Sequence, residues 1–318
     1  TDVRWPAEVE KEIPSSLRLF LVRCLDKDPL ARPSTAEMAA ALAAIGFLPG
    51  QLLDDRYEIV REIGRGGMSR VYRAIDRDLG GDLAIKTVLT PALGRTEDEE
   101  RLFREVQISR RITHTNVVRV HDLGRFPGGI FVIMELLEGP GLDEVIRDEA
   151  PVERGRVKGL LLEIASALGE VHRLQIVHRD LKPGNVILVD GRVKVLDFGI
   201  ARVTDDSTHL TRTGEVIGSP LYMSPEQIQG HPLDGRCDLY ALGVITYTLL
   251  SGREPFAADS PTSVVLKHLN EPPPNIKQIV PDLPDEWVAL LDRMLAKKPE
   301  DRFADAEAVF EAASALPV

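Results

Sequence analysis

The sequence has little cysteine: two residues, Cys24 and Cys237, in 318. Two cysteines are too few for a disulfide framework and lack the spacing of metal ligands, so we expect a reducing compartment. Positive charge is also scarce, because 39 Lys and Arg residues stand against 50 Asp and Glu residues and the net charge is −11. Nucleic acid and anionic lipid both need a positive face, so the composition argues against either as a partner.

Long hydrophobic runs are missing as well. The longest candidate, 240–250, is too short to cross a bilayer and carries two threonines, which predicts a buried core helix. The charged start of the chain, beginning at Thr1, does not resemble a signal peptide. We therefore expect no membrane segment in this chain and a cytoplasmic location, alone or as the cytosolic part of a longer protein.

What the sequence does have is ordinary globular material, with 43% hydrophobic and 28% charged residues. Its length predicts about two domains. Residues 1–45 are helix-like, 46–56 resemble a connector with Gly and Pro, and strand-like alternation starts at Tyr57. A charged helix is expected at 97–111, and helices dominate from about 141, interrupted by short strands at 176–177, 186–189 and 193–196. Strands first and helices later predict an α+β protein with two lobes, 57–136 and 140–316.

One internal repeat spans the chain. Residues 14–37 overlay residues 284–307 without gaps at an offset of 270 positions (302 − 32 = 270). The match includes Pro, Arg and Lys, and pairs Arg32 with Arg302, which favours homology over two amphipathic helices of similar composition. The offset is the length of a whole domain rather than of a solenoid unit.

A glycine cluster, I-G-R-G-G-M-S-R-V-Y at 63–72, lies between two strand patterns. Glycine lets a backbone approach phosphates closely, although glycine-rich hairpins are often only structural. A dinucleotide fold would need a helix after this loop, whereas V-Y-R-A-I-D alternates as a strand. Ser69 occupies the position of the third glycine in a G-x-G-x-x-G loop.

Lys86 ends the apolar strand L-A-I-K, and a lysine there is often only a strand-edge residue. A functional role for Lys86 is favoured by the glycine loop before this strand and by the helix after it, because Glu105 on that helix could pair with Lys86. Glu97, Glu99 and Glu100 are competitors, but they lie at the helix start, where acids favour the helix dipole.

Two polar motifs interrupt buried strands: H-R-D-L-K-P-G-N at 178–185 and D-F-G at 197–199. An Asp, a Lys and an Asn between apolar strands cost desolvation free energy unless they have a task or partners. Asp197 follows Asn185 by 12 residues across a short strand pair, so we expect the two side chains at one site. A carboxylate beside an amide oxygen suits a hard divalent cation such as Mg²⁺.

These motifs, in this order, resemble a bacterial eukaryotic-like (Hanks-type) serine/threonine protein kinase over residues 57–316. The resemblance implies the bilobal kinase fold, ATP with Mg²⁺ or Mn²⁺ as cofactors, and protein substrates. It makes Asp180 the catalytic base, has Lys182 contact the γ-phosphate, and has Lys86, paired with Glu105, hold the α- and β-phosphates. Asn185 and Asp197 would ligate the metal ion. Nucleotide contacts would come from Ile63, Gly64, Gly66, Gly67, Ser69, Val71, Ala84, Lys86, Met134, Glu135 and Leu137.

The resemblance also implies a substrate platform and a regulatory segment. Ser219 would bridge Asp180 and Lys182, Glu226 would pair with Arg302, and Asp238 would hold the backbone at 178–179. His178 and Phe198 are expected to pack, while His172 is taken as structural or solvated. Arg179 beside Asp180 indicates control by phosphorylation, and T-R-T at 211–213 places Thr211 and Thr213 where bacterial relatives are phosphorylated.

Alternatives remain for function and for the first segment. A nucleotide-binding pseudokinase scaffold should lack Lys86, Asp180 or Asp197, and all three are present. A small-molecule phosphotransferase is disfavoured by the S-P-E platform at 224–226. Residues 1–45 resemble the end of a second kinase domain, and three hosts are possible: a missing upstream domain, the kinase of the same chain, or a second copy. The hypothesis is docking on a kinase C-lobe, within one chain or across a homodimer, with Arg32 competing for Glu226, and the alternative is a passive remnant.

Overall fold

The computed structural model describes residues 21–29, 31–34, 46–66, 69–89, 107, 109–126, 129–198 and 220–318. The chain divides into two compact units: an N-terminal unit with residues 1–104 and 120–136, and a C-terminal unit with residues 105–119 and 137–318. Among the helices of the described ranges, none combines the length and apolarity needed to cross a bilayer.

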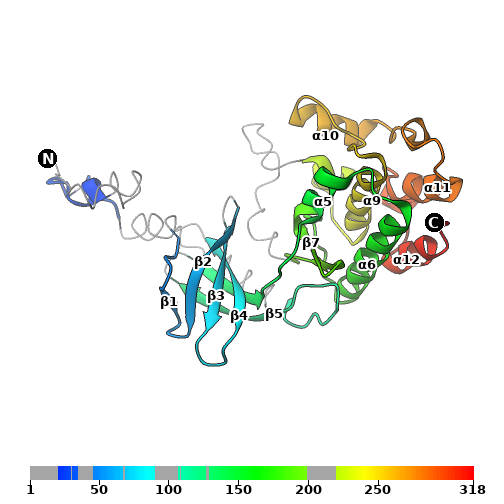
Figure 1. Cartoon of the computed structure of the whole chain (residues 1–318). Coiled ribbons are helices and arrows are strands. Elements are labelled where there is room, and N and C mark those ends of the chain that lie inside the picture. The colour runs from blue at the N-terminus through cyan, green and yellow to red at the C-terminus, as the bar shows by residue number, and fades with distance from the viewer. Residues whose placement is uncertain are drawn as a thin grey trace. The chain divides into compact units, whose positions relative to one another are not determined.

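The N-terminal unit is built on one antiparallel sheet of six strands in the order β1-β2-β3-β4-β6-β5 (Figure 1). Its strands are β1 Leu52–Leu53, β2 Tyr57–Arg65, β3 Ser69–Asp76, β4 Asp82–Leu89, β5 Val120–Phe126 and β6 Gly129–Glu135. Alternation along β3 and β4 buries Tyr72 and Ile85 completely, together with Phe131 of β6, on one sheet face. Lys86 and its neighbours at even spacing therefore lie on the other face.

Residues 46–56 are part of this sheet rather than a connector. β1 pairs with β2, and the ring of Phe47 packs 5.5 Å from that of Tyr72 and 5.2 Å from that of Phe126. The backbone N–H of Phe47 also donates to the Tyr72 hydroxyl at 3.1 Å. The prediction of a linker at 46–56 is therefore wrong. The sequence does not reveal the contact, because a strand of two residues is too short to show periodicity and a single aromatic residue, Phe47, anchors the segment.

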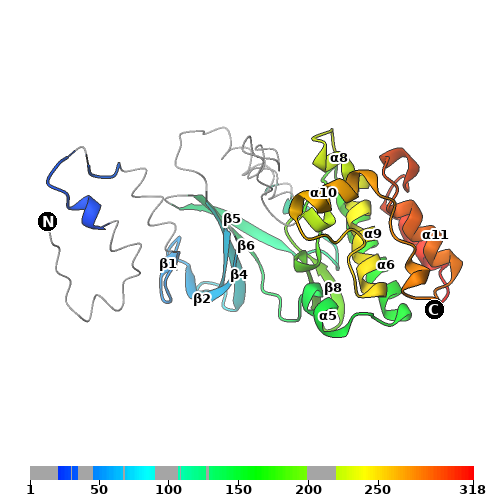
Figure 2. The same cartoon turned by 90° about the horizontal axis from the view of Figure 1, so that it is seen from above.

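The C-terminal unit is mainly helical and surrounds α9, which spans Arg236–Ser251 and is buried from Cys237 to Ser251 (Figure 2). Helices α6, α11 and α12 pack against α9, which confirms the expected core helix at 240–250. The other elements are α5 Leu142–Glu149, α6 Arg154–Arg173, η1 Pro183–Asn185, β7 Val186–Val189, β8 Arg192–Val195, η2 Pro220–Tyr222, α8 Pro225–Ile228, α10 Pro261–Asn270, η3 Ile276–Gln278, α11 Asp285–Met294, η4 Pro299–Asp301 and α12 Ala306–Ser314.

Helix starts follow the sequence signals. Glu153 accepts hydrogen bonds from the first-turn N–H groups of α6, and Asp305 accepts one from Ala308 at the start of α12. The strand expected at 176–177 is absent from the described residues, while β7 and β8 lie close to the predicted ranges.

Residues 109–119 belong with the C-terminal unit, whereas the sequence placed them in the first lobe. The reason is a set of backbone hydrogen bonds to β8: Val118 N–H donates to the Val195 carbonyl, and Val195 N–H donates to the Asn116 carbonyl. Such pairing across nearly 80 residues leaves no local sequence pattern.

Candidate active site

One face of the N-terminal sheet brings together the predicted nucleotide contacts of its central strands. Val71 pairs with Lys86 across β3 and β4, and Ala84 pairs with Met134 across β4 and β6. Directly paired residues of antiparallel strands share a face, and so do residues two apart on one strand. Val71, Ala84, Lys86 and Met134 therefore lie on a single face. Lys86 is 8% exposed.

The glycine-rich segment is the turn of the β2–β3 hairpin. Gly66 N–H donates to the Ser69 carbonyl at 2.8 Å, and a Cβ added to Gly66 would lie 2.9 Å from the Ser69 hydroxyl. Gly64 faces Val71 with room for a Cβ, and Ile63 lies in the irregular register between Glu62 and Gly64. Gly67 lies outside the described residues, as does Glu105, the expected partner of Lys86.

Glu135 ends β6, and Leu137 follows in the C-terminal unit. The two residues thus occupy the stretch of chain that joins the units.

In the loop 178–185, two of the predicted residues, Lys182 and Asn185, contact the carboxylate of a third, Asp180. Lys182 Nζ lies 2.6 Å from Asp180 Oδ2, and Asn185 Nδ2 donates to the same oxygen at 3.1 Å and to the Asp180 carbonyl at 2.7 Å. The Asp180 side chain is 49% exposed, so it is held in place yet reachable from solvent. This is the arrangement that a base needs when it must accept a proton from an external hydroxyl.

Asn185 and Asp197 are joined by the β7–β8 hairpin. Val186 pairs with Val195, and Leu196 N–H donates to the Asn185 carbonyl at 2.9 Å. Asp197 therefore directly follows a residue whose backbone is bonded to Asn185. Asp197 has φ +61°, a left-handed conformation that a non-glycine residue adopts only under tertiary constraint.

His178 connects the two motifs by a second route. Its Nε2–H donates to the Leu196 carbonyl at 2.8 Å, and its Nδ1 accepts the Asp180 N–H at 3.3 Å. Its ring packs 4.8 Å from the Phe198 ring. The expected packing of His178 and Phe198 is thus seen, and the imidazole also fixes the spacing of the two polar segments.

A buried carboxylate on α9 holds the loop from below. Asp238 accepts the backbone N–H of His178 and of Arg179, both at 2.8 Å, and lies 2.8 Å from His172 Nε2. Burial raises the pKa of this carboxyl, but the hydrogen bond from His172 and the backbone N–H groups outweigh it, so the pKa of Asp238 lies below its usual value. Asp238 is therefore a charged anchor, as the resemblance implies.

The predicted pair of Glu226 and Arg302 is present. Arg302 Nη1 and Nη2 donate to the two carboxylate oxygens of Glu226 at 2.7 Å each, and both side chains are buried. Gln227, the next residue, donates from Nε2 to the Arg179 carbonyl at 2.6 Å and so ties α8 to the loop. Ser219, Thr211 and Thr213 lie outside the described residues.

Sequence reasoning missed several positioning residues. The sequence predicts His172 only as a structural or solvated residue, and it does not predict the roles of Gln227, Asn116 and Glu163. Asn116 Nδ2 donates to Glu163 at 3.1 Å and to the Val193 carbonyl, while Glu163 accepts Val193 N–H. The one sequence signal for this contact is the H-T-N motif at 114–116, part of a polar stretch between apolar residues.

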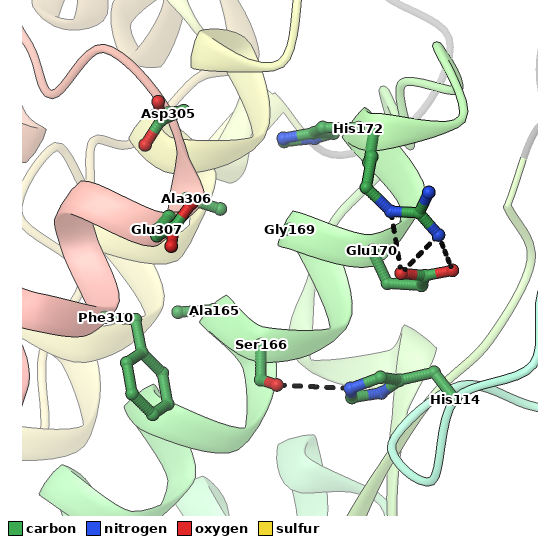
Figure 3. Close-up of a pocket in the computed structure, with 11 residues that line it drawn as sticks. His114, Ala165, Ser166, Gly169, Glu170, His172, Asp305, Ala306, Glu307 and Phe310 are labelled. Carbon is green, nitrogen blue, oxygen red and sulfur yellow. Dashed lines mark hydrogen bonds and ion pairs between the residues drawn. The ribbon is translucent and has the colours of Figure 1, made fainter.

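A cavity of about 570 Å³ lies elsewhere in the C-terminal unit, between α6, α12 and the segment before β5 (Figure 3). Ser166 and His114 meet there at 3.1 Å, and Phe310 of α12 contributes an apolar side chain. None of the predicted site residues is among those that line this cavity, but His172, which does line it, bonds to Asp238, the carboxylate that accepts the backbone N–H groups of His178 and Arg179.

The donor set at 185–197 fits a divalent cation shared with phosphate. Within the described ranges, no group of three or more His, Cys, Asp or Glu side chains could hold a metal by itself. Both side-chain hydrogen bonds of Asn185 to the described residues are donated from Nδ2, so its Oδ1 is available to accept or to ligate a cation. Mg²⁺ typically takes one or two protein oxygens and completes its shell with phosphates and water.

A two-unit α+β fold, with a lysine-bearing sheet face in one unit and, in the other, an Asp-Lys-Asn loop bonded to the segment that bears Asp197 and Phe198, defines the class of protein kinases. Comparison supports this, since the protein kinase domain profile matches residues 57–313. The chain belongs to the protein kinase family, whose members transfer phosphate from ATP with a divalent metal ion. The curated relatives that it matches are named as serine/threonine protein kinases of bacteria, and the match confirms the predicted family and fold class.

Three curated relatives illustrate this. The chain is 40% identical over 270 residues to serine/threonine-protein kinase pkn3 of Myxococcus xanthus, covering 81% of this chain and 49% of the relative. It is 39% identical to PrkC of Bacillus subtilis, covering 82% and 40%. The third is the DNA damage-responsive kinase RqkA of Deinococcus radiodurans, at 41% identity over 80% of this chain and 38% of the relative. The chain thus spans less than half the length of these relatives.

Among solved structures, the PknI kinase domain of Mycobacterium tuberculosis is similar, with a TM-score of 0.67 and 29% identity. The match covers 84% of this chain and 99% of that domain.

Proposed function

We propose that this chain is an active serine/threonine protein kinase that transfers the γ-phosphoryl group of ATP to hydroxyl groups of protein substrates. The observation that carries the proposal is the cluster of Asp180, Lys182 and Asn185, bonded through Leu196 to the segment that bears Asp197. A pseudokinase is not favoured, because Lys86, Asp180 and Asp197 are all retained.

The proposed roles divide between the units. On the N-terminal sheet face, Lys86 with Glu105 holds the α- and β-phosphates, the hairpin around Gly64 and Gly66 covers them, and Val71, Ala84 and Met134 contact adenine. The remaining nucleotide contacts are those of Ile63, Gly67 and Ser69 in the hairpin and the backbone of Glu135 and Leu137.

In the C-terminal unit, Asp180 orients the substrate hydroxyl and accepts its proton, while Lys182 neutralises charge on the moving phosphoryl group. Asn185 and Asp197 hold Mg²⁺, which we favour over Mn²⁺ and which supplies charge neutralisation to the phosphates when bound. The backbone N–H groups of His178 and Arg179, which donate to Asp238, keep Asp180 at a fixed position, and positioning is most of what phosphoryl transfer requires.

Regulation and partners follow the same pattern. We propose that Thr211 and Thr213 are autophosphorylated, and that Ser219 and Glu226 support the platform for protein substrates. Arg179 would then bind the new phosphate, which carries about −1.5 to −2 charges.

Phosphoryl transfer to a generic protein substrate, with Mg²⁺ and with Mn²⁺, tests the activity. Asp180→Asn should lower turnover by about 10²- to 10⁴-fold. Asp190→Asn is the matched control, because it replaces Asp by Asn at an exposed position in the β7–β8 turn. Transfer that survives Asp180→Asn undiminished would refute the role of the base, and no transfer by the unaltered chain would favour the pseudokinase.

Phosphopeptide mapping tests the regulatory sites. Trypsin cleaves after Arg202 and Arg212, so Thr211 and Thr213 fall in separate peptides. We expect label in both peptides after incubation with ATP. Label confined to peptides outside 200–217 would exclude these sites without affecting the proposed activity.

Calorimetric titration with Mg-ATP separates the two carboxylates. Asp180→Asn should leave nucleotide affinity nearly intact, because Asp180 serves the hydroxyl. Asp197→Asn should weaken it, because Asp197 serves the metal ion. Equal loss in both variants would contradict this division of roles.

A further inference from the structure

Residues 21–34 reproduce the backbone of the junction between α11 and η4 at the same offset of 270 positions as the sequence repeat. Leu25 N–H donates to the Leu21 carbonyl and Ala31 N–H to the Asp28 carbonyl, as Leu295 does to Leu291 and Asp301 to Lys298. Hydrogen bonds of this kind occur wherever a helix ends, so they show similar shape and no more.

The arginine is more specific. Arg32 Nε donates to the Asp26 carbonyl at 2.8 Å, and Arg302 Nε donates to the Ala296 carbonyl at 2.8 Å. A side chain that bonds a carbonyl six residues earlier is not a generic helix end. It is the feature that, in the C-terminal unit, aims the guanidinium at Glu226.

The two copies differ in burial. Leu295 is fully buried and Arg302 is 2% exposed, whereas Leu25 is 60% exposed and Arg32 is exposed. Among the described residues, Nε to Asp26 is the one hydrogen bond of the Arg32 side chain, while Arg302 also bonds both oxygens of Glu226. The first copy thus leaves Leu25 and Arg32 exposed and Leu21 and Cys24 partly exposed, whereas the second copy buries the counterparts of all four.

The kinase domain of this chain does not offer a vacancy for that face. Both oxygens of Glu226 are taken by Arg302, and Glu226 is only 5% exposed. A Cβ at Gly243 of α9 would lie 2.8 Å from Met294 and 3.1 Å from Leu295, so the groove that takes this face is already filled. Docking of Arg32 there, in the same chain or a second copy, would require expelling a buried ion pair.

We propose that residues 21–34 are the closing piece of a second kinase-type C-terminal lobe, encoded in the same polypeptide before residue 21. That lobe would supply a buried glutamate for both Nη atoms of Arg32. It would also supply an apolar helix with a small residue, such as Gly243 here, opposite Cys24 and Leu25, the counterparts of Met294 and Leu295. The longer protein is then a tandem of two kinase-type domains.

Cys24 reports on this directly, because its counterpart Met294 is fully buried. The experiment compares thiol alkylation of Cys24, followed on the tryptic peptide 24–27, in the 318-residue chain and in the polypeptide extended along its own gene by one kinase domain. We expect alkylation to be at least about tenfold slower in the extended protein, because a covered thiol reacts only through local opening.

Arg32→Ala in the extended protein should restore fast alkylation, whereas Arg23→Ala should not. Because Arg23→Ala removes the tryptic site before Cys24, alkylation in that variant is followed on the peptide 19–27. Arg23 is the matched control because its counterpart, Arg293, is exposed in the C-terminal unit. Hydrogen exchange at 21–34 gives a second measurement for the same proteins, with protection expected only in the extended form.

Three results would overturn the proposal. One is equal alkylation in the two proteins, and another is protection of Cys24 already in the 318-residue chain, which would point to its own kinase domain or a second copy as the host. The third is a coding sequence before residue 21 that encodes no kinase-type C-terminal lobe. None of these depends on the kinase activity of residues 57–316.

Discussion

His172 Nε2 lies 2.8 Å from Oδ2 of Asp238, the oxygen that also accepts the backbone N–H of His178. A carboxylate can only accept, so Nε2 carries the proton, and the imidazole completes the set of donors around a fully buried charge. The position of the catalytic loop thus depends on a histidine in α6.

Replacing that histidine should affect catalysis more than nucleotide binding. His172→Ala removes one donor from Asp238, which should cost about 1–3 kcal/mol of stability. Loosening of the loop should lower kcat by about 10- to 100-fold with a smaller change in the KM for ATP. Steady-state kinetics with His121→Ala, an exposed histidine, as control tests this. Equal loss in kcat and in nucleotide affinity would argue against a role through the loop.

The ion pair of Glu226 and Arg302 should behave as a unit. Removing one partner leaves a buried charge unpaired, so Glu226→Gln or Arg302→Met should each cost about 3–5 kcal/mol. The double variant should cost clearly less than the sum of the two. A denaturation double-mutant cycle measures the difference.

The exposed pair of Arg73 and Asp82, also 2.7 Å apart, is the control for that cycle and should contribute about 0–1 kcal/mol. Additive losses at Glu226 and Arg302 would mean that the two residues are not coupled.

His268 predicts a specific acid sensitivity. Burial, and then the nearby charge of Lys297, lower the pKa of His268 from 6.5 to about 3. Its Nδ1 is bonded to the Tyr240 hydroxyl at 2.9 Å, so the folded protein holds the neutral ring. Below pH 6.5 the unfolded chain takes up a proton that the folded chain does not, so this contribution to stability is complete above pH 6.5 and is lost as the pH falls toward 3.

Between pH 6.5 and 5 the loss from His268 should be about 2 kcal/mol. His268→Asn should flatten the fall in urea-unfolding free energy over that range, while His231→Asn, at an exposed site, should not. A pH profile that is unchanged in the His268 variant would contradict the assignment.

Phe47 should stabilise the N-terminal sheet. Its ring contacts with Tyr72 and Phe126, together with its burial, should contribute about 2 kcal/mol to the free energy of unfolding. Phe47→Ala should therefore lower the melting temperature by roughly 4–8 °C. Leu48→Ala is the control, because Leu48 is 62% exposed. A melting temperature unchanged by Phe47→Ala would return 46–56 to the role of a passive connector.

The sequence was most informative where chemistry restricts residue type. Asp180, Lys182, Asn185 and Asp197 could be found because few other side chains do their work, and their spacing is set by one short hairpin. The face shared by Val71, Ala84, Lys86 and Met134 could be found because strand alternation is regular.

The positioning residues could not be found in this way. His172 and Asp238 are 66 positions apart, and Gln227 and Arg179 are 48 apart. Neither residue of such a pair is unusual in its own neighbourhood, so only the folded chain shows the contact. The same holds for residues 116–118. Their backbone hydrogen bonds to β8 explain why 109–119 belong to the C-terminal unit, although the sequence predicts them in the first lobe.

The β7–β8 hairpin sets a limit on how the length of this chain can change. Its turn, Asp190 and Gly191, has positive φ at both positions and joins two arms of four residues each. One residue inserted in either arm would turn the Asp197 side chain to the opposite face and shift it by about 3.3 Å relative to Asn185. A residue inserted at the turn itself would leave both ends where they are. We therefore expect an added residue to be accepted at 190–191 but not in the arms, so that the chain length between Asn185 and Asp197 can change only at the turn.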